Sequence, residues 1–217
     1  MHRFPLVLLA GLLALSPALP ADRIRAAPTT PAPAASAVER FVIVPAESQV
    51  IYRVAETFIN ENNRFNLAVG ITQIVRGEIF VDRRNPQHSR VGTITVDISQ
   101  FRSDNARRDR AIRERWLESA RYPLAEFTPT AIRGLPAAYT EDREIALEIT
   151  GNLKIREAVK PTIFATMLKL ERNIVTGTAA ATILMTDFGF DPPAIFGILR
   201  AENQARLEFK FVARRAP

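Results

Sequence analysis

Apolar and polar residues alternate over most of the chain beyond about residue 38, and this period of two is the strongest constraint on its fold. Successive side chains of a β-strand point to opposite faces, so the alternation predicts strands with one buried face. The clearest cases are residues 50–54, 93–98, 145–149 and 207–211. A helix over these segments is disfavoured, because the apolar positions of an amphipathic helix recur every three or four residues.

Further runs of β-type residues bring the set to about eight strands, at residues 71–81, 124–128, 162–170 and 176–185. Turn-forming residues separate the runs, for example Asn85-Pro86 and Asp191-Pro192-Pro193. Short turns between successive strands predict antiparallel pairing. About eight such strands, each with one apolar face, predict an all-β sandwich or a closed barrel.

One segment departs from this pattern. Residues 103–118 (SDNARRDRAIRERWLE) are rich in helix formers, and Ser103 or Asp104 is placed to cap the first turn. Ile112 and Trp116 fall on one side at helical spacing, while arginines occupy the rest. The segment predicts one amphipathic helix that lies against the β-structure.

The N-terminus has the pattern of an export signal. A short positive start ending at Arg3 precedes a mostly apolar run at residues 4–19, and small residues follow. We therefore predict a signal peptide at residues 1–21, a Pro/Ala-rich linker at 22–37 and one domain at 38–217. The expected location is periplasmic or extracellular. An uncleaved N-terminal anchor is the alternative, although the run is shorter than the roughly 20 residues that span a bilayer.

Composition argues against most enzyme classes. The chain has no Cys, which excludes a thiol nucleophile. Only His2 and His88 carry an imidazole, so the chain has too few histidines for a His-rich metal site, and a Ser-His-Asp triad is disfavoured. No pair of carboxylates stands out as a glycosidase site. Basic residues outnumber acidic ones by 29 to 23, but they are scattered among acids and form no track for a nucleic acid. We predict no catalytic residue, no metal site, no cofactor and no nucleic-acid partner.

Two features have two interpretations each. The predicted helix and its borders carry seven arginines, which form either a solvated face or a binding patch for an anion such as phosphate. Small residues at 177–181 (GTAAA) either let another element approach closely or leave space for a ligand inside the β-structure.

Several short motifs occur along the domain in a characteristic order. The most specific is GNLKI at 151–155 with VKP at 159–161. The others are FVIVPAESQVIYRV at 41–54, GIT at 70–72 with GEI at 77–79, VDI at 96–98, SD at 103–104, Arg108-Asp109, YP at 122–123 with FTPT at 127–130, and DFGF at 187–190. In this order and spacing the motifs resemble the YceI-like family, the lipocalin-like polyisoprenoid-binding proteins of the bacterial envelope, over about residues 40–213.

The chain also departs from the family pattern in ways that bear on the identity of a ligand. Glu47 stands before Ser48 where many members have His. The usual Gly-Val-Thr turn is replaced by residues 157–159 (EAV), and Met185 stands where many members have Arg.

The resemblance implies an eight-stranded antiparallel lipocalin-like barrel with the helix beside it and an elongated apolar cavity. It implies a non-enzymatic protein that holds a long isoprenoid lipid, with a polyprenyl or quinone tail, for transport, storage or envelope stress protection. Peripheral membrane contact and a monomeric or homodimeric state are compatible with it. The alternatives are a structural or interaction protein with a filled barrel, and a barrel that holds another lipid or small amphiphile.

Alternation then selects the residues expected to line such a cavity. These are Tyr52, Val54, Ile94, Val96, Ile98, Leu147, Ile149, Phe209 and Phe211. Arg108 and Asp109 are neighbours on the predicted helix and cannot face each other. We expect Asp109 to accept hydrogen bonds that fix the helix, and Arg108 to lie nearer the cavity mouth, where it contacts a lipid head group.

Overall fold

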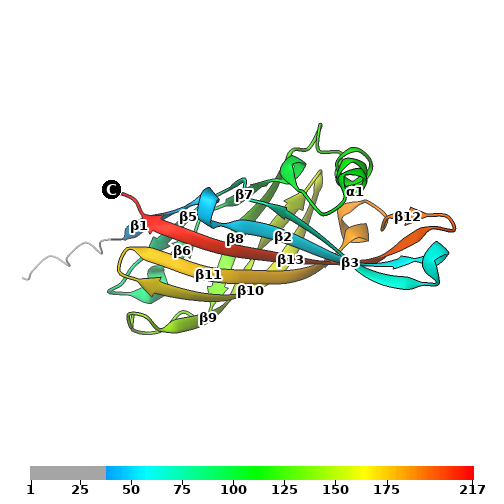
Figure 1. Cartoon of the computed structure of the whole chain (residues 1–217). Helices are drawn as coiled ribbons and strands as arrows, with labels where there is room; N and C mark the ends of the chain where they lie inside the picture. Colours follow the sequence, from blue (N-terminus) through cyan, green and yellow to red (C-terminus); the bar gives the residue numbers. More distant parts are fainter. Residues whose placement is uncertain (1–37) are drawn as a thin grey trace, which may run out of the picture. The chain divides into compact units, whose positions relative to one another are not determined.

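The computed structural model describes residues 38–217, most of which belong to a thirteen-stranded antiparallel sheet (Figure 1). The predicted signal peptide and linker therefore lie outside the described residues. The strands are β1 (Glu39–Ile43), β2 (Gln49–Phe58), β3 (Arg64–Thr72), β4 (Val75–Arg76), β5 (Glu78–Val81), β6 (Arg90–Val91), β7 (Ile94–Asp97), β8 (Leu124–Arg133), β9 (Glu144–Ile155), β10 (Ala158–Glu171), β11 (Ile174–Leu184), β12 (Ala194–Ile195) and β13 (Leu199–Arg215). The helix α1 (Ala106–Ala111) continues into a π-helical turn over Ile112–Trp116.

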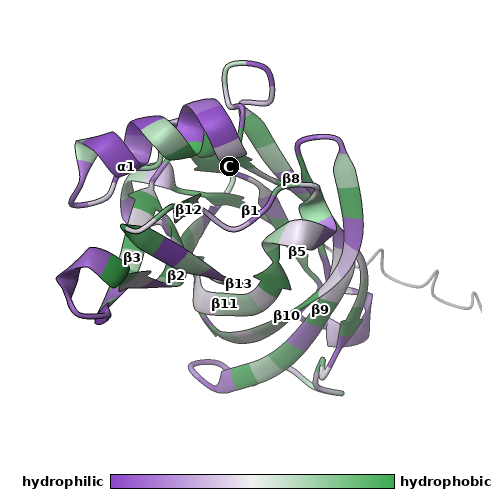
Figure 2. Ribbon diagram, turned by 90° about the vertical axis from the view of Figure 1, so that its right-hand side faces the viewer, coloured by the Kyte–Doolittle hydropathy of each residue, from purple (hydrophilic) through white to green (hydrophobic). Residues whose placement is uncertain are grey.

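The strand pairings form a curled antiparallel sheet, whose circuit closes when segments separated by short breaks, such as β4 and β5, are counted as one strand. This confirms the predicted all-β, lipocalin-like barrel fold. Strand β13 pairs with β1 and β2, and these pair with β5 and β3. From there β5 pairs with β6 and β4 with β7, and the ladder continues through β8, β9, β10 and β11 back to β13. Figure 2 shows the strands curled around a common axis, with α1 along one side.

The strand count differs from the predicted eight because three of the eight members of this circuit are interrupted. The interrupted members are β1 with β2, β3 with β4 and β5, and β6 with β7. The first break begins at Pro45, where a proline cannot donate to a ladder and a short 3-10 turn follows. The remaining strand, β12, pairs only with β13 and forms a hairpin beyond the circuit.

The helix begins later than predicted. Asn105 is the N-cap, and its side chain accepts hydrogen bonds from the backbone amides of Arg107 and Arg108 at 3.0 and 3.1 Å. The expectation of a cap at Ser103 or Asp104 was therefore wrong. The hydroxyl of Ser103 instead donates to the carboxylate of Asp109 at 2.6 Å, which leaves the capping role to Asn105.

The core consists of two neighbouring clusters of buried side chains. One cluster lies near the helix and includes Tyr52, Phe101 and Met185. The other includes Phe41, which is fully buried, and Phe211. Within residues 38–217, no helix has both the length and the apolarity to cross a bilayer.

Candidate ligand-binding cavity

An apolar cavity of about 220 Å³ runs inside the barrel. Its wall takes residues from both core clusters, such as Phe101 and Ile155 from one and Ile43 and Phe211 from the other. Almost every wall residue is aliphatic or aromatic. A well-packed interior holds few voids larger than a water molecule, so this space is more than a packing defect.

Eight of the nine residues selected by alternation lie in this wall. They are Tyr52, Val54, Ile94, Val96, Ile98, Ile149, Phe209 and Phe211. The ninth, Leu147, is buried but lies outside the wall. Alternation identifies the inward face of a strand, but whether that face meets open space or a neighbouring side chain depends on the packing around it.

Sequence reasoning missed several wall residues that come from outside the alternating strands. Ile112, Trp116 and Leu117 follow α1, and Phe101 precedes it. The helical spacing of Ile112 and Trp116 predicts an apolar side of the helix, and both residues lie in the cavity wall. Phe101 carried no comparable signal, because it stands alone between a short turn and the helix.

The small residues of β11 serve both of the functions considered for them. A Cβ atom on Gly177 would lie 2.7 Å from the ring of Phe211, so glycine there permits close packing. Ala179, two residues further along the same face, lies in the cavity wall. A similar close approach occurs at Gly70, where a Cβ would lie 2.1 Å from the Tyr52 ring.

One part of the wall is polar, because Tyr52 and Glu56 both contribute to it. Glu56 is 5 % exposed, and its Oε2 accepts hydrogen bonds from Asn66 Nδ2 at 2.9 Å and from Arg108 Nη2 at 3.2 Å. Burial raises the pKa of Tyr52 well above its ordinary value, and the nearby charge of Asp109 acts in the same direction. Tyr52 therefore keeps a neutral hydroxyl at this position.

Arg108 lies behind this polar part of the wall. Besides Glu56, its guanidinium contacts the Asp104 carboxylate at 2.5 Å and the Ser103 hydroxyl at 3.3 Å. Arg108 itself is not a wall residue. Two carboxylates thus already compensate its positive charge, and of these three groups only Glu56 belongs to the cavity wall.

The remaining arginines of the helix region do not form one patch. Arg102, Arg113 and Arg121 border a shallow polar hollow on the surface, together with Ser99 and Ser119. Arg113 donates to the carbonyl of Phe101 at 3.4 Å rather than to a common anion site. In the part of the chain that the structure describes, no group of three or more His, Asp and Glu side chains is placed to hold a metal ion.

A curled antiparallel barrel with a helix beside it and an apolar interior defines a lipocalin-like protein. The YceI-like domain matches residues 41–213, and the chain belongs to the YceI-like family. This confirms the resemblance inferred from the sequence motifs. No curated protein sequence matches the chain.

Solved structures share this fold at low sequence identity. BcnA of Burkholderia cenocepacia is 16 % identical with a TM-score of 0.60, covering 78 % of this chain and 98 % of its own. A polyisoprenoid binding domain from Saccharophagus degradans, implicated in plant cell wall breakdown, is 9 % identical with a TM-score of 0.61, covering 82 % and 99 %. The YCEI protein of Campylobacter jejuni is 14 % identical with a TM-score of 0.54, covering 68 % and 84 %.

Proposed function

We propose that this protein is an exported, non-enzymatic binding protein that holds a long isoprenoid lipid in its barrel. The observation that carries the proposal is the apolar cavity, whose wall draws on both core clusters. A long apolar tail in water is stabilised by about 25 cal/mol for each Å² removed from solvent, and this wall offers such an environment. The similarity to a polyisoprenoid binding domain supports the same ligand class.

A barrel that serves only as a structural or interaction module is the second candidate. A filled interior would favour it, and here about 220 Å³ stays open. This volume is below the roughly 300–1,000 Å³ of typical ligand pockets, so a long tail requires some wall side chains to move. Met185 is suited to such movement, since its unbranched side chain adapts to irregular space and it lies in the wall.

The proposed ligand carries an uncharged head group. Three glutamates, Glu56, Glu126 and Glu208, belong to the cavity wall, and a carboxylate there repels a phosphate but accepts a hydrogen bond from a hydroxyl. Tyr52 is in the same wall, and its hydroxyl is a neutral hydrogen-bonding group. Polyprenols and quinols fit this chemistry better than polyprenyl phosphates, and the head-group contact predicted for Arg108 then passes through Glu56. Transport, storage and protection of the envelope under stress are all compatible roles.

The test adds bulk at two matched positions. Val96→Trp places a large ring in the cavity wall, so we expect at least a roughly tenfold loss of affinity for a detergent-solubilised polyprenol, with a modest change in stability. Leu147→Trp overpacks a buried site outside the wall, so it should cost about 1–3 kcal/mol of unfolding free energy and leave the affinity of the folded protein unchanged.

The measurements are native mass spectrometry of the complexes and denaturant unfolding of each variant. A folded Val96→Trp variant that binds polyprenol as tightly as the natural chain would contradict the proposal. So would the absence of any bound isoprenoid from protein purified out of its own envelope.

A further inference from the structure

Large apolar side chains project from two hairpins at one end of the barrel. These side chains are Ile59, Phe65, Ile195, Phe196 and Ile198, which we call the apolar tip. Phe196 is fully exposed and Phe65 is 67 % exposed, while the three isoleucines are each close to half exposed. Single exposed apolar residues are ordinary, but a contiguous group of this size indicates an interaction site.

Backbone hydrogen bonds join the two hairpins to each other, so the fold itself holds the side chains of the apolar tip together. Leu199 of β13 pairs with Phe58 of β2, and the amide of Ile59 donates to the carbonyl of Ile198 at 2.8 Å. Figure 1 shows the β2–β3 and β12–β13 hairpins side by side, extending past α1. The tip is convex, because its side chains sit at and beside the turns rather than around a groove.

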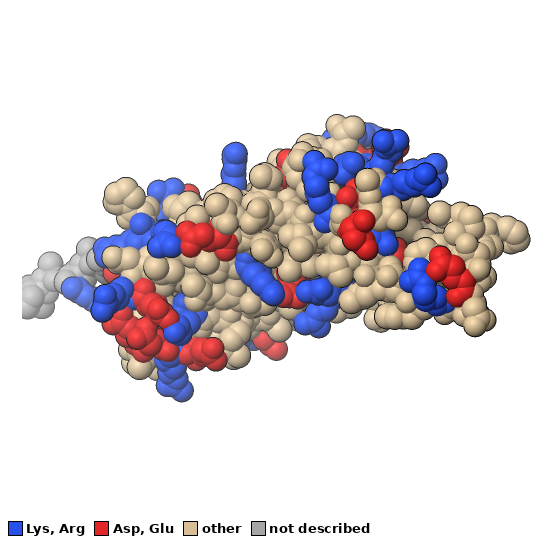
Figure 3. Space-filling model, viewed as in Figure 1, with Lys and Arg blue, Asp and Glu red and all other residues tan. Residues whose placement is uncertain are grey.

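Basic side chains lie next to this apolar surface. Arg107, Arg110 and Arg115 of the helix region are exposed, and none of them forms an ion pair with any residue of the described range 38–217. Arg200 is also exposed, two residues after Ile198. In Figure 3 the basic atoms over α1 lie beside this end of the molecule, which is uncharged apart from one group of adjoining acidic and basic atoms.

The hairpins that carry the tip also supply part of the cavity wall. Glu56 and Ala68 belong to β2 and β3, and Pro193 immediately precedes β12. The end of the cavity with the polar wall therefore lies at the base of the tip. A lipid that leaves a bilayer at the tip would meet this end of the cavity first.

We propose that the apolar tip inserts into the surface of an anionic lipid bilayer while the arginines of the helix region contact the lipid head groups. Exposed aromatic and aliphatic side chains beside basic residues are the combination that binds such an interface. A second copy of the chain is disfavoured, because a symmetric contact through the tips would bring the two basic helix regions together. Binding of the tip to a bilayer does not depend on isoprenoid binding. Only the biological reason for it, the exchange of lipid between the bilayer and the cavity, rests on the proposed function.

The first experiment measures insertion at a single position. The sequence has no Cys, so Phe196→Cys and Ile163→Cys each provide one site for an environment-sensitive dye. Ile163 is 57 % exposed on the outer face of β10 and serves as the control. With vesicles containing about 30 % phosphatidylglycerol, we expect a blue shift for the dye at position 196 only. A dye at 196 that stays in an aqueous environment on vesicles would overturn the proposal.

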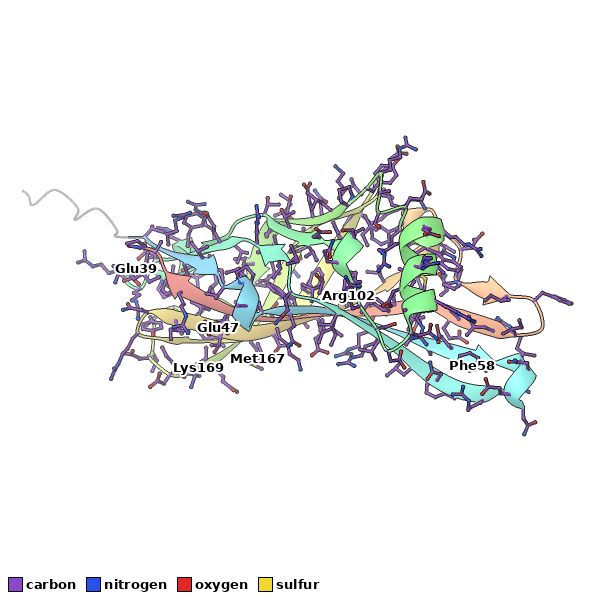
Figure 4. The ribbon with its side chains drawn as sticks, turned by 45° about the horizontal axis from the view of Figure 1, so that its top comes forward. Glu39, Glu47, Phe58, Arg102, Met167 and Lys169 are labelled. Carbon is purple, nitrogen blue, oxygen red and sulfur yellow. The ribbon has the colours of Figure 1, made fainter. Side chains whose placement is uncertain are left out.

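The second experiment compares matched double variants in vesicle flotation. Ile195→Ser/Phe196→Ser should weaken vesicle binding by about tenfold or more, whereas Ile163→Ser/Met167→Ser on the barrel wall should not. Figure 4 shows Met167 and Lys169 on β10 well away from Phe58 at the tip. Arg107→Gln/Arg110→Gln should weaken binding to anionic vesicles more than Arg133→Gln/Arg143→Gln.

Other outcomes have distinct meanings. A dimer in solution that Phe196→Ser dissociates, without any vesicle binding, would assign the tip to a second copy and overturn the bilayer proposal. Val96→Trp, which blocks the cavity, should bind vesicles normally. A natural chain that binds vesicles but no polyprenol would overturn the proposed function and leave the docking proposal standing.

Discussion

The carboxylate of Asp109 joins the start of the helix to the chain before it. Asp109 is 7 % exposed, and its two oxygens accept from the backbone amide of Ser103 at 3.0 and 3.1 Å and from the Ser103 hydroxyl at 2.6 Å. These contacts agree with the role expected for it from the sequence. Because a buried donor without an acceptor is costly, Asp109 should contribute more to stability than its exposed neighbours.

Asp109→Ala should lower the free energy of unfolding by about 1–3 kcal/mol, because the Ser103 amide and hydroxyl lose their acceptor. Asp104→Ala is the matched control, since the Asp104 side chain is 80 % exposed and its partner Arg108 keeps the ion pair with Glu56, so we expect a loss of about 1 kcal/mol or less. Urea unfolding of both variants gives the comparison. Equal losses would show that the contacts of Asp109 do not stabilise the helix.

At the scale of the strands, a side chain supplies the hydrogen-bond acceptor that is missing at the break between β1 and β2. Ser48 is completely buried, and its hydroxyl accepts a hydrogen bond from the backbone amide of Val212 at 3.1 Å. This bond replaces a backbone pairing that the turn at Pro45–Glu47 removes from the ladder with β13. The Ser that begins the second strand of the family motif thus has a structural role here.

Ser48→Ala should destabilise the protein by about 1–3 kcal/mol, because the Val212 amide is left buried without its acceptor. Hydrogen exchange resolves the effect locally, and the amide of Val212 should exchange faster even under conditions where the whole chain remains folded. Unchanged exchange at Val212 would mean that water or a shifted backbone takes over the role of the hydroxyl.

At the scale of the whole molecule, the proposed function includes export from the cytoplasm. We propose export through residues 1–21, which together with the linker lie outside the described residues. Residues 1–40 fused to a phosphatase that is active only outside the cytoplasm should produce activity. Leu12→Arg/Leu13→Arg interrupts the apolar run and should abolish it, since signal recognition depends on that run. Activity that the two arginines leave unchanged, or no activity at all, would contradict export by this segment.

The sequence by itself determined an all-β fold with one amphipathic helix and most of the inward-facing residues, whereas the choice of a barrel over a sandwich came from the family resemblance. Strand geometry places every second side chain on one face, so Val54, Ile94 and Phe209 could be assigned to the interior without knowing their neighbours. The apolar side of the helix, with Ile112 and Trp116, followed from helical spacing in the same way. These features depend on local periodicity, which a single chain displays directly.

Only the tertiary structure decided where the interior is open and where it is filled. Leu147 has the same pattern as Ile149 but lies outside the cavity wall, because packing by other strands, not periodicity, determines the free space. Glu56 and Arg108 are 52 positions apart in sequence and meet only when α1 lies against β2. The apolar tip likewise needs β13 to pair with β2, since long-range pairing brings together segments that no local pattern relates.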